Sequence, residues 1–373
     1  MVGVVPSPSR IRELALEAGF ELVGFGPPEP GADGERFVRW LDAGRAGEMH
    51  YLHTQKELIV DPRGTWAPNA RSALALAHDY GGPPAGLQGG GRIARYAQGR
   101  DYHRYLGLRT EKLRAQLERE GIPWGTTKLG TDAMPILERA LATRAGIGFL
   151  AKSAGVISPT LGPWLLLSEL LLPLEAPFDL PAPGSCGTCT QCLDACPTGA
   201  ITAPFEVDAR RCLSYTTIEL RGAIPPELRA PQGEWLFGCD VCLEVCPFAK
   251  RGRAASKAER PPELRPHEVV TSYTLVGVLG MSEAEFATRW TGTAMRRATR
   301  TGLRRNAAIV LGNLGDPAAV PALATALADP DPLVRGHAAW ALGRLEGGRP
   351  HLDRALRHET AAGVQAELRA AMG

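Results

Sequence analysis

The eight cysteines of this 373-residue chain all lie between Cys186 and Cys246, in two interlocking runs. The first run reads CGTCTQCLDACP from Cys186, and the second consists of Cys212 followed by CDVCLEVCP from Cys239. This order is typical of a bacterial ferredoxin-like module with two [4Fe-4S] clusters, in which the last cysteine of each run binds the other cluster. It predicts one cluster on Cys186, Cys189, Cys192 and Cys246, and a second on Cys196, Cys212, Cys239 and Cys242.

Other uses of the cysteines fit less well. Two zinc sites would also need eight thiols, but zinc sites usually separate their Cys-x-x-Cys pairs and do not end in Cys-x-x-x-Cys-Pro. Disulfides need an oxidising compartment, and the first twenty residues lack the apolar core of a signal peptide. The most apolar run, 164–173, contains Ser168 and Glu169 and is too short to span a membrane. We therefore expect a cytoplasmic protein with no membrane partner, and a monomer by default.

The pattern along the chain predicts an α+β protein of three domains, covering residues 1–178, 179–265 and 266–373. In the first domain, periodicity and capping residues predict helices over 9–18, 101–120 and 133–145, and strands over 21–26 and 72–78. A proline-rich stretch, 173–184, leads into the cysteine module.

The last domain is repetitive and helical. The segment AAIVLGNL at 307–314 recurs as AAWALGRL at 338–345, with Asp-Pro pairs at 316–317 and 331–332 marking turns. This spacing indicates HEAT-like helical repeats that share a core between neighbours.

A basic run precedes the first repeat. No acidic residue lies between Glu285 and Asp316, a stretch that contains six arginines. Such a run can be a solvated helix face or a surface for a polyanion such as RNA, and both interpretations stay open at this point. Lys250, Arg251 and Arg253 would extend a basic surface toward the clusters. The six arginines are Arg289, Arg296, Arg297, Arg300, Arg304 and Arg305.

Asp132, within LGTDAMPIL, is the strongest candidate for acid–base chemistry. It can be the N-cap of the following helix, or a proton donor, because a carboxyl in an apolar setting can stay protonated near neutral pH. Nearby, Asp101-Tyr-His103 is similar to the Asp-x-His-x-x-Gly signature of cobalamin ligation through histidine. Leu106 stands at the glycine position, so we do not expect His103 to bind cobalt.

Several segments in the same order resemble the tRNA epoxyqueuosine reductase family over nearly the whole chain. Besides the cysteine runs and Asp132, they are YAQGRDYH at 96–103, Glu138-Arg139, AGIGFLAK at 145–152, GPWLLLSE at 162–169, DARRCLSY at 208–215 and RRNAAIVLGN at 304–313. The chain departs from the family at FLAKS, 149–153, where many members read WIGKN, and near Asp61-Pro62, where an expected arginine is missing.

The resemblance implies a nitroreductase-like N-terminal domain that binds cobalamin, two clusters that supply its electrons, and reduction of epoxyqueuosine to queuosine at the wobble position of tRNA. The electrons would come from an external flavodoxin- or ferredoxin-type donor. Asp132 would be the proton donor, and the basic run would bind tRNA. The implied cofactor contacts are Asp132, Arg139, Lys152, Ser153, Val156, Leu167, Ser214 and Asp240, and the implied tRNA contacts are Arg296, Arg297, Arg300, Arg304, Arg305 and Asn306.

Two other functions would use similar parts. A reductive dehalogenase would share the clusters, cobalamin and a proton donor, but would have no use for basic repeats. An iron–sulfur electron carrier with docking repeats would need neither cobalamin nor the long N-terminal domain.

Overall fold

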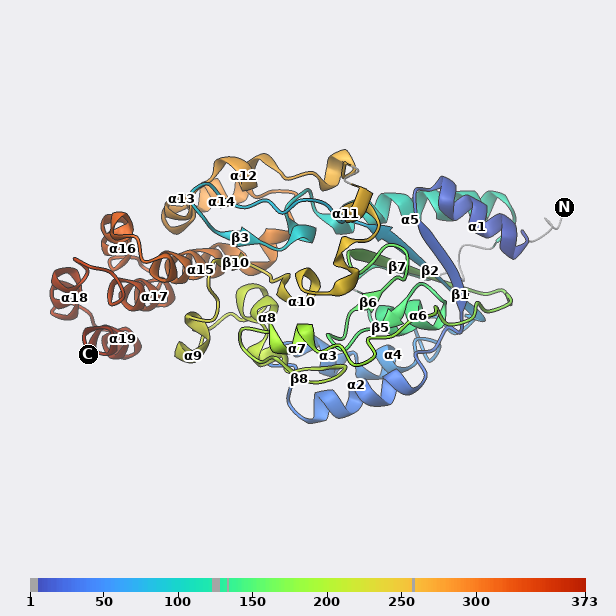
Figure 1. The fold of residues 1–373 in the computed structure, drawn as a ribbon, viewed down its shortest axis with the longest axis horizontal. Helices are drawn as coiled ribbons and strands as arrows, with labels where there is room; N and C mark the ends of the chain where they lie inside the picture. Colours follow the sequence, from blue (N-terminus) through green and yellow to red (C-terminus); the bar gives the residue numbers. More distant parts are fainter. Residues whose placement is uncertain (1–5, 123–127, 133, 257–258) are drawn as a thin grey trace.

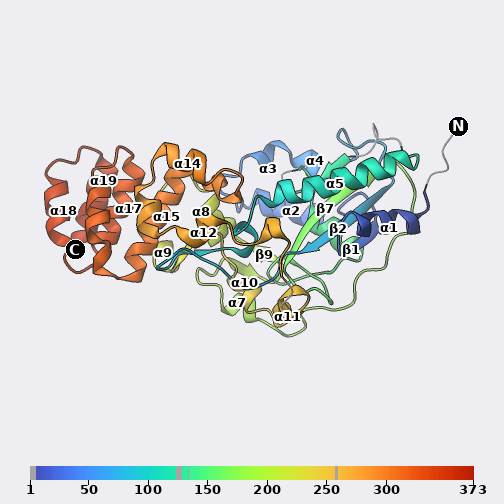
Figure 2. The same ribbon diagram turned by 90° about the horizontal axis from the view of Figure 1, so that it is seen from above.

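The computed structural model describes residues 6–122, 128–132, 134–256 and 259–373. The molecule is elongated, with a β-sheet near one end, the C-terminal helices at the other, and the cysteine module between them (Figure 1). The described N-terminal segment and the C-terminus consequently lie far apart (Figure 2).

The central sheet has four antiparallel strands in the order β1–β2–β7–β4. All residues of β2 and all but the first of β7 are buried, because α1 and α5 pack on one face of the sheet and α6 on the other. The strands are β1 (Leu22–Gly26), β2 (Ser72–Asp79), β7 (Leu165–Leu172) and β4 (Lys128–Gly130). The helices of this half are α1 (Pro8–Glu17), α2 (Ala32–Asp42), α3 (Tyr51–Thr54), α4 (Lys56–Val60), α5 (Tyr102–Arg119) and α6 (Glu138–Arg144).

Most of the expected elements of this half are confirmed, and one is shifted. The apolar run at 164–173 forms the buried strand β7, and no helix among the described residues is long and apolar enough to cross a membrane. The helix expected over 133–145 begins only at Glu138; Ala133 itself lies outside the described residues. Pro135 explains the delay, because a residue that precedes proline is disfavoured in the helical region.

The cysteine module is joined to the N-terminal half by a shared pair of strands. β10 (Trp235–Phe237) pairs in parallel with β3 (Arg92–Ile93), although the two lie far apart in the sequence. The other strands are β5 (Phe149–Leu150), β6 (Val156–Ile157), β8 (Ile201–Ala203) and β9 (Glu206–Val207). The helices of the module are α7 (Gln191–Asp194), α8 (Leu213–Ile218), α9 (Pro226–Arg229), α10 (Val241–Glu244) and α11 (Arg253–Ser256).

The C-terminal helices stack in succession, with α13 against α15, α15 against α17 and α17 against α19. The two copies of the sequence repeat fall on α15 and α17, so the predicted repeat architecture is confirmed. The helices are α12 (Glu268–Ser272), α13 (Leu275–Gly280), α14 (Glu283–Arg289), α15 (Thr299–Leu314), α16 (Val320–Ala326), α17 (Pro332–Leu342), α18 (Arg349–Leu356) and α19 (Ala362–Met372).

Arg305 and Asn306 anchor the repeats to the cysteine module. Both are fully buried in α15. The guanidinium of Arg305 donates to the carbonyl oxygens of Thr216, Leu220 and Gly222 at 2.6–2.8 Å, and the amide of Asn306 donates to those of Thr217 and Leu236 at 2.8 and 2.9 Å. One continuous apolar core also runs from Ile11 to Leu368. The three predicted domains therefore pack as one body, and their boundaries stay a prediction.

Replacing Arg305 with alanine should destabilise the whole protein. The change removes three charge-assisted hydrogen bonds and leaves the buried carbonyl of Thr216 without this donor, which costs about 3 kcal/mol of unfolding free energy. Thermal denaturation should show the loss. The matched control is Arg296→Ala at an exposed position, where we expect a change within about 0.5 kcal/mol; equal effects of the two substitutions would contradict the anchoring role.

Candidate active site

The cysteines are free thiols that gather in two neighbouring groups. Cys186, Cys189, Cys192 and Cys246 line one recess, together with Cys242 and Phe248. Phe149 and Ile157 lie behind Cys186 and Cys246. The last cysteine of the second run has thus joined the first three of the first run, as the crossed ligand pattern requires.

The remaining four cysteines, Cys196, Cys212, Cys239 and Cys242, lie close enough to influence one another's pKa values. Burial, followed by the proximity of Cys212, raises the pKa of Cys239 to about 12, and Cys196 is also among the charges that act on it. Burial raises the pKa of Cys242 well above its ordinary value, with Cys239 and Cys212 as the nearest further causes. Such thiols need a cationic partner to lose their protons, which bound iron supplies.

Cys196 has a different environment within the same group. Burial opposes its ionisation, but backbone N–H groups of Ile201 and Ala200 outweigh burial and lower its pKa; the Ala200 donor lies 3.2 Å from the sulfur. The donors come from the turn that directly follows Cys196-Pro, so the local sequence itself builds a hydrogen-bonded thiolate.

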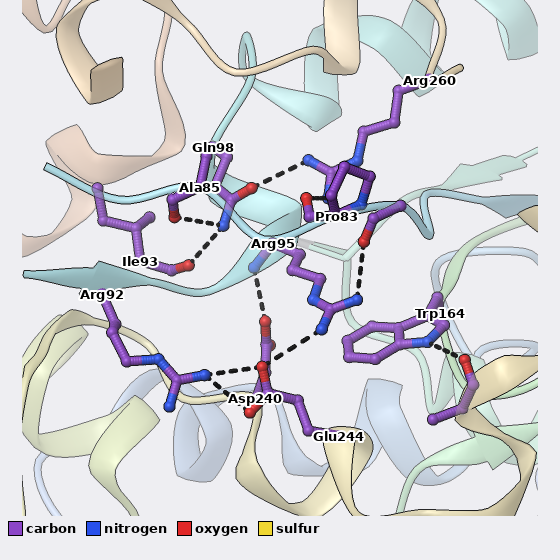
Figure 3. Close-up of polar contacts among 12 residues, drawn as sticks. Pro83, Ala85, Arg92, Ile93, Arg95, Gln98, Trp164, Asp240, Glu244 and Arg260 are labelled. Atoms are coloured by element: carbon purple, nitrogen blue, oxygen red, sulfur yellow. Dashed lines mark hydrogen bonds and ion pairs between the residues drawn. The ribbon is translucent and has the colours of Figure 1, made fainter. Parts of the chain in front are cut away.

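A network of charged side chains clamps the Cys239–Cys242 loop to the N-terminal half (Figure 3). Asp240 is buried and its carboxylate accepts from the backbone N–H of Arg95 at 2.7 Å. The Arg95 guanidinium lies 4.1 Å from the ring centre of Trp164 and 3.3 Å from Glu244, and Arg92 donates twice to the same Glu244 carboxylate at 2.7 and 2.8 Å. Burial raises the pKa of Asp240 to about 6.

Asp132 lies beside the first turn of α5, where its carboxylate contacts the side chains of the first two helix residues. The Tyr102 hydroxyl donates to its Oδ2, and His103 Nε2 lies 3.1 Å from the same oxygen. The backbone of Asp132 has φ 46°, a left-handed conformation that aspartate tolerates at some cost and that often marks functional loops. Asp132 is therefore not the N-cap of α6, because that helix starts six residues later, at Glu138.

The surroundings of Asp132 also differ from the expected apolar setting. Its side chain is 50% exposed. Burial opposes its ionisation, but hydrogen bonds from His103 and Tyr102 outweigh burial and lower its pKa. For His103, hydrogen bonds to Asp101, at 2.7 Å, and to Asp132 outweigh the opposing effect of burial and raise the pKa to about 9. Near neutral pH the shared proton accordingly resides on His103.

Three further groups beside Asp132 escaped the sequence analysis as site residues. Glu138 accepts from the backbone N–H of Asp132 at 3.1 Å, and burial, followed by the charge of Asp132, raises its pKa to about 7. Glu169 is fully buried. The ring of the half-buried Tyr96 lies 5.4 Å from the ring of Tyr102 and 6.4 Å from that of Phe237 in β10. Only their presence in the family-like segments 96–103, 138–139 and 162–169 signalled them.

The expected cofactor contacts fall into two groups. Arg139 and Ser214 are at least partly accessible, and Ser153 lines the recess of Cys186. Arg139 donates to the carbonyl of Ala154 at 2.8 Å, and Ala154 has φ 61°, so this strained turn lies between the acid and the first cysteine group. Val156 and Leu167, by contrast, pack inside an apolar cluster behind α6.

Lys152 holds the first cysteine loop in place. Its Nζ donates to the carbonyls of Gly187 and Cys189 at 2.8 and 2.9 Å, and its backbone N–H donates to the sulfur of Cys186 at 3.4 Å. Its ammonium group is thus already engaged with protein oxygens beside the cluster ligands.

The basic run separates into exposed and buried arginines. Arg304 donates to the Leu279 carbonyl at 2.7 Å and pairs with Asp329. Because the side chains of Arg304, Arg305 and Asn306 are buried and bound to protein groups, the expectation that they contact tRNA is wrong. The three residues are consecutive on α15, with Arg304 directed toward α13 and Arg305 and Asn306 directed toward the cysteine module.

Two other arginines of the run also pair with acidic side chains. Arg297 donates twice to Glu219 at 2.8 Å, and Arg300 pairs with Glu283. Arg297 lies 6.0 Å from the ring of the partly exposed Tyr51, and Asp132 is among the charges that act on both residues. Arg289, Arg296 and Arg297 are thus the exposed part of the run, and Arg297 lies within electrostatic range of the candidate proton donor.

The expected basic extension after the second cysteine run is only partly at the surface, where Lys250 and Arg251 are exposed. The guanidinium of Arg253 pairs with Glu21 and donates to the backbone carbonyl of Asp79 at 3.0 Å, and Arg251 donates to the Pro159 carbonyl. These side chains connect the cysteine module to the N-terminal half.

Three separate segments of the chain match known protein families. Residues 60–133 match the model described as "Epoxyqueuosine reductase QueG, DUF1730", residues 185–249 match a 4Fe-4S double cluster binding domain, and residues 290–373 match HEAT repeats. The epoxyqueuosine reductase of Xanthomonas campestris is 39% identical over 344 residues, which cover 90% of this chain and 95% of that protein. The chain belongs to the epoxyqueuosine reductase family.

Other members agree in sequence and in structure. The epoxyqueuosine reductase of Gloeobacter violaceus is 38% identical over 320 residues, covering 84% of this chain and 98% of that protein. A crystal structure of an epoxyqueuosine reductase with an epoxyqueuosine-modified tRNA-Tyr stem loop has a TM-score of 0.85 and 30% identity, covering 98% of this chain and 97% of that one. A Bacillus subtilis structure, whose aspartate-bearing catalytic loop is swung out of the active site, has a TM-score of 0.83 and 29% identity at the same coverage.

Changing His103 to glutamine should alter the pH dependence of stability in this family member. Because the pKa of His103 is raised from 6.5 to about 9, its stabilising charge is fully present below about pH 6.5 and is lost as the pH rises through about 9. The difference in unfolding free energy between wild type and H103Q should therefore be largest near pH 6 and shrink toward pH 10. Denaturant titrations at a series of pH values measure it, with the exposed His358→Gln as control; a difference that grows with pH would refute the assignment.

The crossed ligand pattern can be tested by changing Cys246 to serine. If Cys246 belongs with Cys186, Cys189 and Cys192, the substitution should remove one cluster and lower the iron content per chain by about half. Electron paramagnetic resonance of the reduced protein should then show one cluster where wild type shows two interacting ones. Ser185→Ala, next to the same loop, serves as the control and should keep the full iron content.

Proposed function

We propose that this protein reduces the epoxide of epoxyqueuosine in tRNA to give queuosine. The observation that carries the proposal is the position of Asp132, a partly exposed carboxylate on a strained loop that shares a proton with His103. The rings of Tyr102 and Tyr96 lead from Asp132 to Phe237 in the two-cluster module. The family relationship over almost the whole chain, including the repeats, supports the same activity over a dehalogenase or an electron carrier.

The proposed electron path uses both clusters, with the ligand sets expected from the cysteine order. An external one-electron donor, of flavodoxin or ferredoxin type, would reduce them one electron at a time. The recess lined by Cys186, Cys189, Cys192 and Cys246 and the electrostatic influence of the other four cysteines on one another support this pairing.

Cobalamin would bind between the cysteine module and Asp132. The partly accessible polar side chains of Arg139, Ser153 and Ser214 suit the amide groups of a corrin, and Asp240 lies beside the same region through Tyr96. Val156 and Leu167 would support these residues from behind, within the nitroreductase-like domain that we infer for residues 1–178, and Lys152 would hold the adjoining cluster loop. Bound cobalamin would supply reducing chemistry at the carbon skeleton of the epoxide.

The protein side chains would manage the proton that the reaction needs. His103 holds a proton at Nε2, 3.1 Å from Asp132 Oδ2, and Asp132 would pass it to the epoxide oxygen as a C–O bond breaks. The Tyr102 hydroxyl, which donates to the same Oδ2, would keep the carboxylate oriented. A positioned acid of this kind typically contributes about 10²- to 10⁴-fold to the rate.

The tRNA would approach over the exposed arginines of the run. Arg296 and Arg297 are exposed, and the charge of Asp132 acts on Arg297, so a phosphate bound there would lie near the reacting nucleoside. Arg300 would contribute less, because it is half-buried and paired with Glu283. The active unit that we propose is a monomer.

The test is turnover of tRNA that carries epoxyqueuosine, with Asp132→Asn as the decisive variant. Wild type, reduced and supplied with cobalamin, should convert epoxyqueuosine to queuosine, as measured by mass spectrometry of digested tRNA. D132N should lose at least about 10²-fold in rate while its iron–sulfur absorbance and tRNA binding stay intact. Asp353→Asn in α18 is the matched control and should keep full activity. No conversion by wild type would refute the activity, and full activity of D132N would refute the role of Asp132.

A further inference from the structure

Glu169 is an unpartnered buried carboxyl group in the middle of β7. It is fully buried, and neither carboxylate oxygen has a hydrogen-bond partner among the described residues. A charged carboxylate in such a place would carry a large desolvation cost, so the neutral, protonated form is favoured. An isolated acid inside a sheet contributes nothing to packing that leucine would not provide, which points to a chemical use.

The register of the sheet directs this carboxyl group toward α6. Glu169 pairs with Ala75 of β2 and Gly130 of β4, so these residues share one face of the sheet. On that face the neighbouring positions Leu167 and Leu171 pack against residues of α6. Gly130 itself comes two residues before Asp132, so the strand that borders Glu169 leads directly to the proposed proton donor.

The charged groups around Glu169 come from the elements that cover this face. β2 offers only alanines there, Ala73, Ala75 and Ala77. On β4, Lys128 pairs with Leu171 and not with Glu169. On α6, Arg139 is bound to the Ala154 carbonyl, and Arg144 lies 3.7 Å from Glu29. The groups that act on Glu169 are Glu138 and Asp132, which, after burial, raise its pKa well above the ordinary value.

Glu138 is the first residue of α6, the helix that covers the sheet face on which Glu169 lies. Its Oε2 accepts from the backbone N–H of Asp132 at 3.1 Å, and its own pKa of about 7 is set by burial and then by Asp132. Three carboxyl groups in one place cannot all be ionised near neutral pH. Since Asp132 is ionised beside His103, the proton is held by Glu138 and Glu169.

The proposed reaction needs such a store of protons. Converting the epoxide to the alkene breaks both C–O bonds, forms the C=C double bond and releases the oxygen as water. This consumes two electrons, which the external donor supplies through the clusters, and two protons. The His103–Asp132 pair accounts for one proton only.

We propose that Glu169 holds the second proton of the reaction and passes it, by way of Glu138, to Asp132 after the first C–O bond has broken. Because no hydrogen bond joins Glu169 to Glu138 among the described residues, this transfer requires a rotation of the Glu169 side chain or an intervening water. Glu169 does not touch the substrate; it acts through Glu138 and Asp132. Asp132 thereby donates twice in one turnover, first with the proton from His103 and then with the proton from the buried pair. This inference rests on the proposed function.

The test uses Glu169→Gln, which keeps the size of the side chain but cannot release a carboxyl proton. With full-length protein containing both clusters and cobalamin, we expect E169Q to lower kcat on epoxyqueuosine tRNA by on the order of 10²-fold, with KM and iron–sulfur absorbance unchanged. The wild-type pH–kcat profile should fall in two alkaline steps, one from the carboxyl pair and one from His103 at about pH 9; E169Q should lose the first step and keep the second. Glu169→Asp should restore part of the rate and the first step, and Leu171→Met, a volume-conserving change on the same face, should behave as wild type.

The outcomes separate this inference from the proposed function. If wild type fails to convert the substrate, the function itself is wrong. If wild type is active and E169Q has the same kcat and pH profile, only the proton store is wrong. A lower kcat with an unchanged pH profile, or an equal loss in L171M, would assign Glu169 a structural role and overturn the inference.

Discussion

Cys246 lies beside Cys186, Cys189 and Cys192 around one recess, although a long stretch of chain separates it from them. Bringing it there requires the second cysteine run to fold back over the first, and the intervening chain supplies α8 and β10 on the way. β10 then pairs with β3 of the N-terminal half, and α8 receives Arg305 from the repeats. The remaining packing of the protein therefore depends on this return of the chain, because both neighbouring parts attach to it.

The same arrangement decides where protons reside. Asp132, Glu138 and Glu169 come from a loop, a helix start and a strand, and they meet where the sheet, α5 and α6 converge. Two carboxyl groups of this set are kept neutral by burial and mutual repulsion, while Asp132 is ionised because Tyr102 and His103 bind it. Redox cofactors deliver electrons, but the removal of oxygen as water also needs protons at the same point. In the proposed reaction, the iron–sulfur clusters would therefore supply the electrons and this group of carboxyl side chains the protons.

Charge patterns in the sequence were only partly informative about the surface. The absence of acids between Glu285 and Asp316 suggested an unpaired basic face, yet Glu219 and Glu283 from outside the run pair with Arg297 and Arg300. Arg305 and Asn306 turned out to be interior anchors. A run of arginines on one helix face therefore cannot by itself distinguish nucleic-acid contacts from buried ties to neighbouring backbone carbonyls, since both use the same side chains at the same spacing.

The sequence by itself determined the two-cluster module, the helical repeats and most helices and strands, because cysteine spacing, repeat period and hydrophobic periodicity are local properties of the chain. It also singled out Asp132. What only the tertiary structure decided is the state of each ionisable group: that Asp132 is ionised and half exposed, that His103 carries the proton, and that Glu169 is buried without a partner. The physical reason is that a pKa, like the role of an arginine, is set by burial and by partners that folding brings from distant parts of the chain.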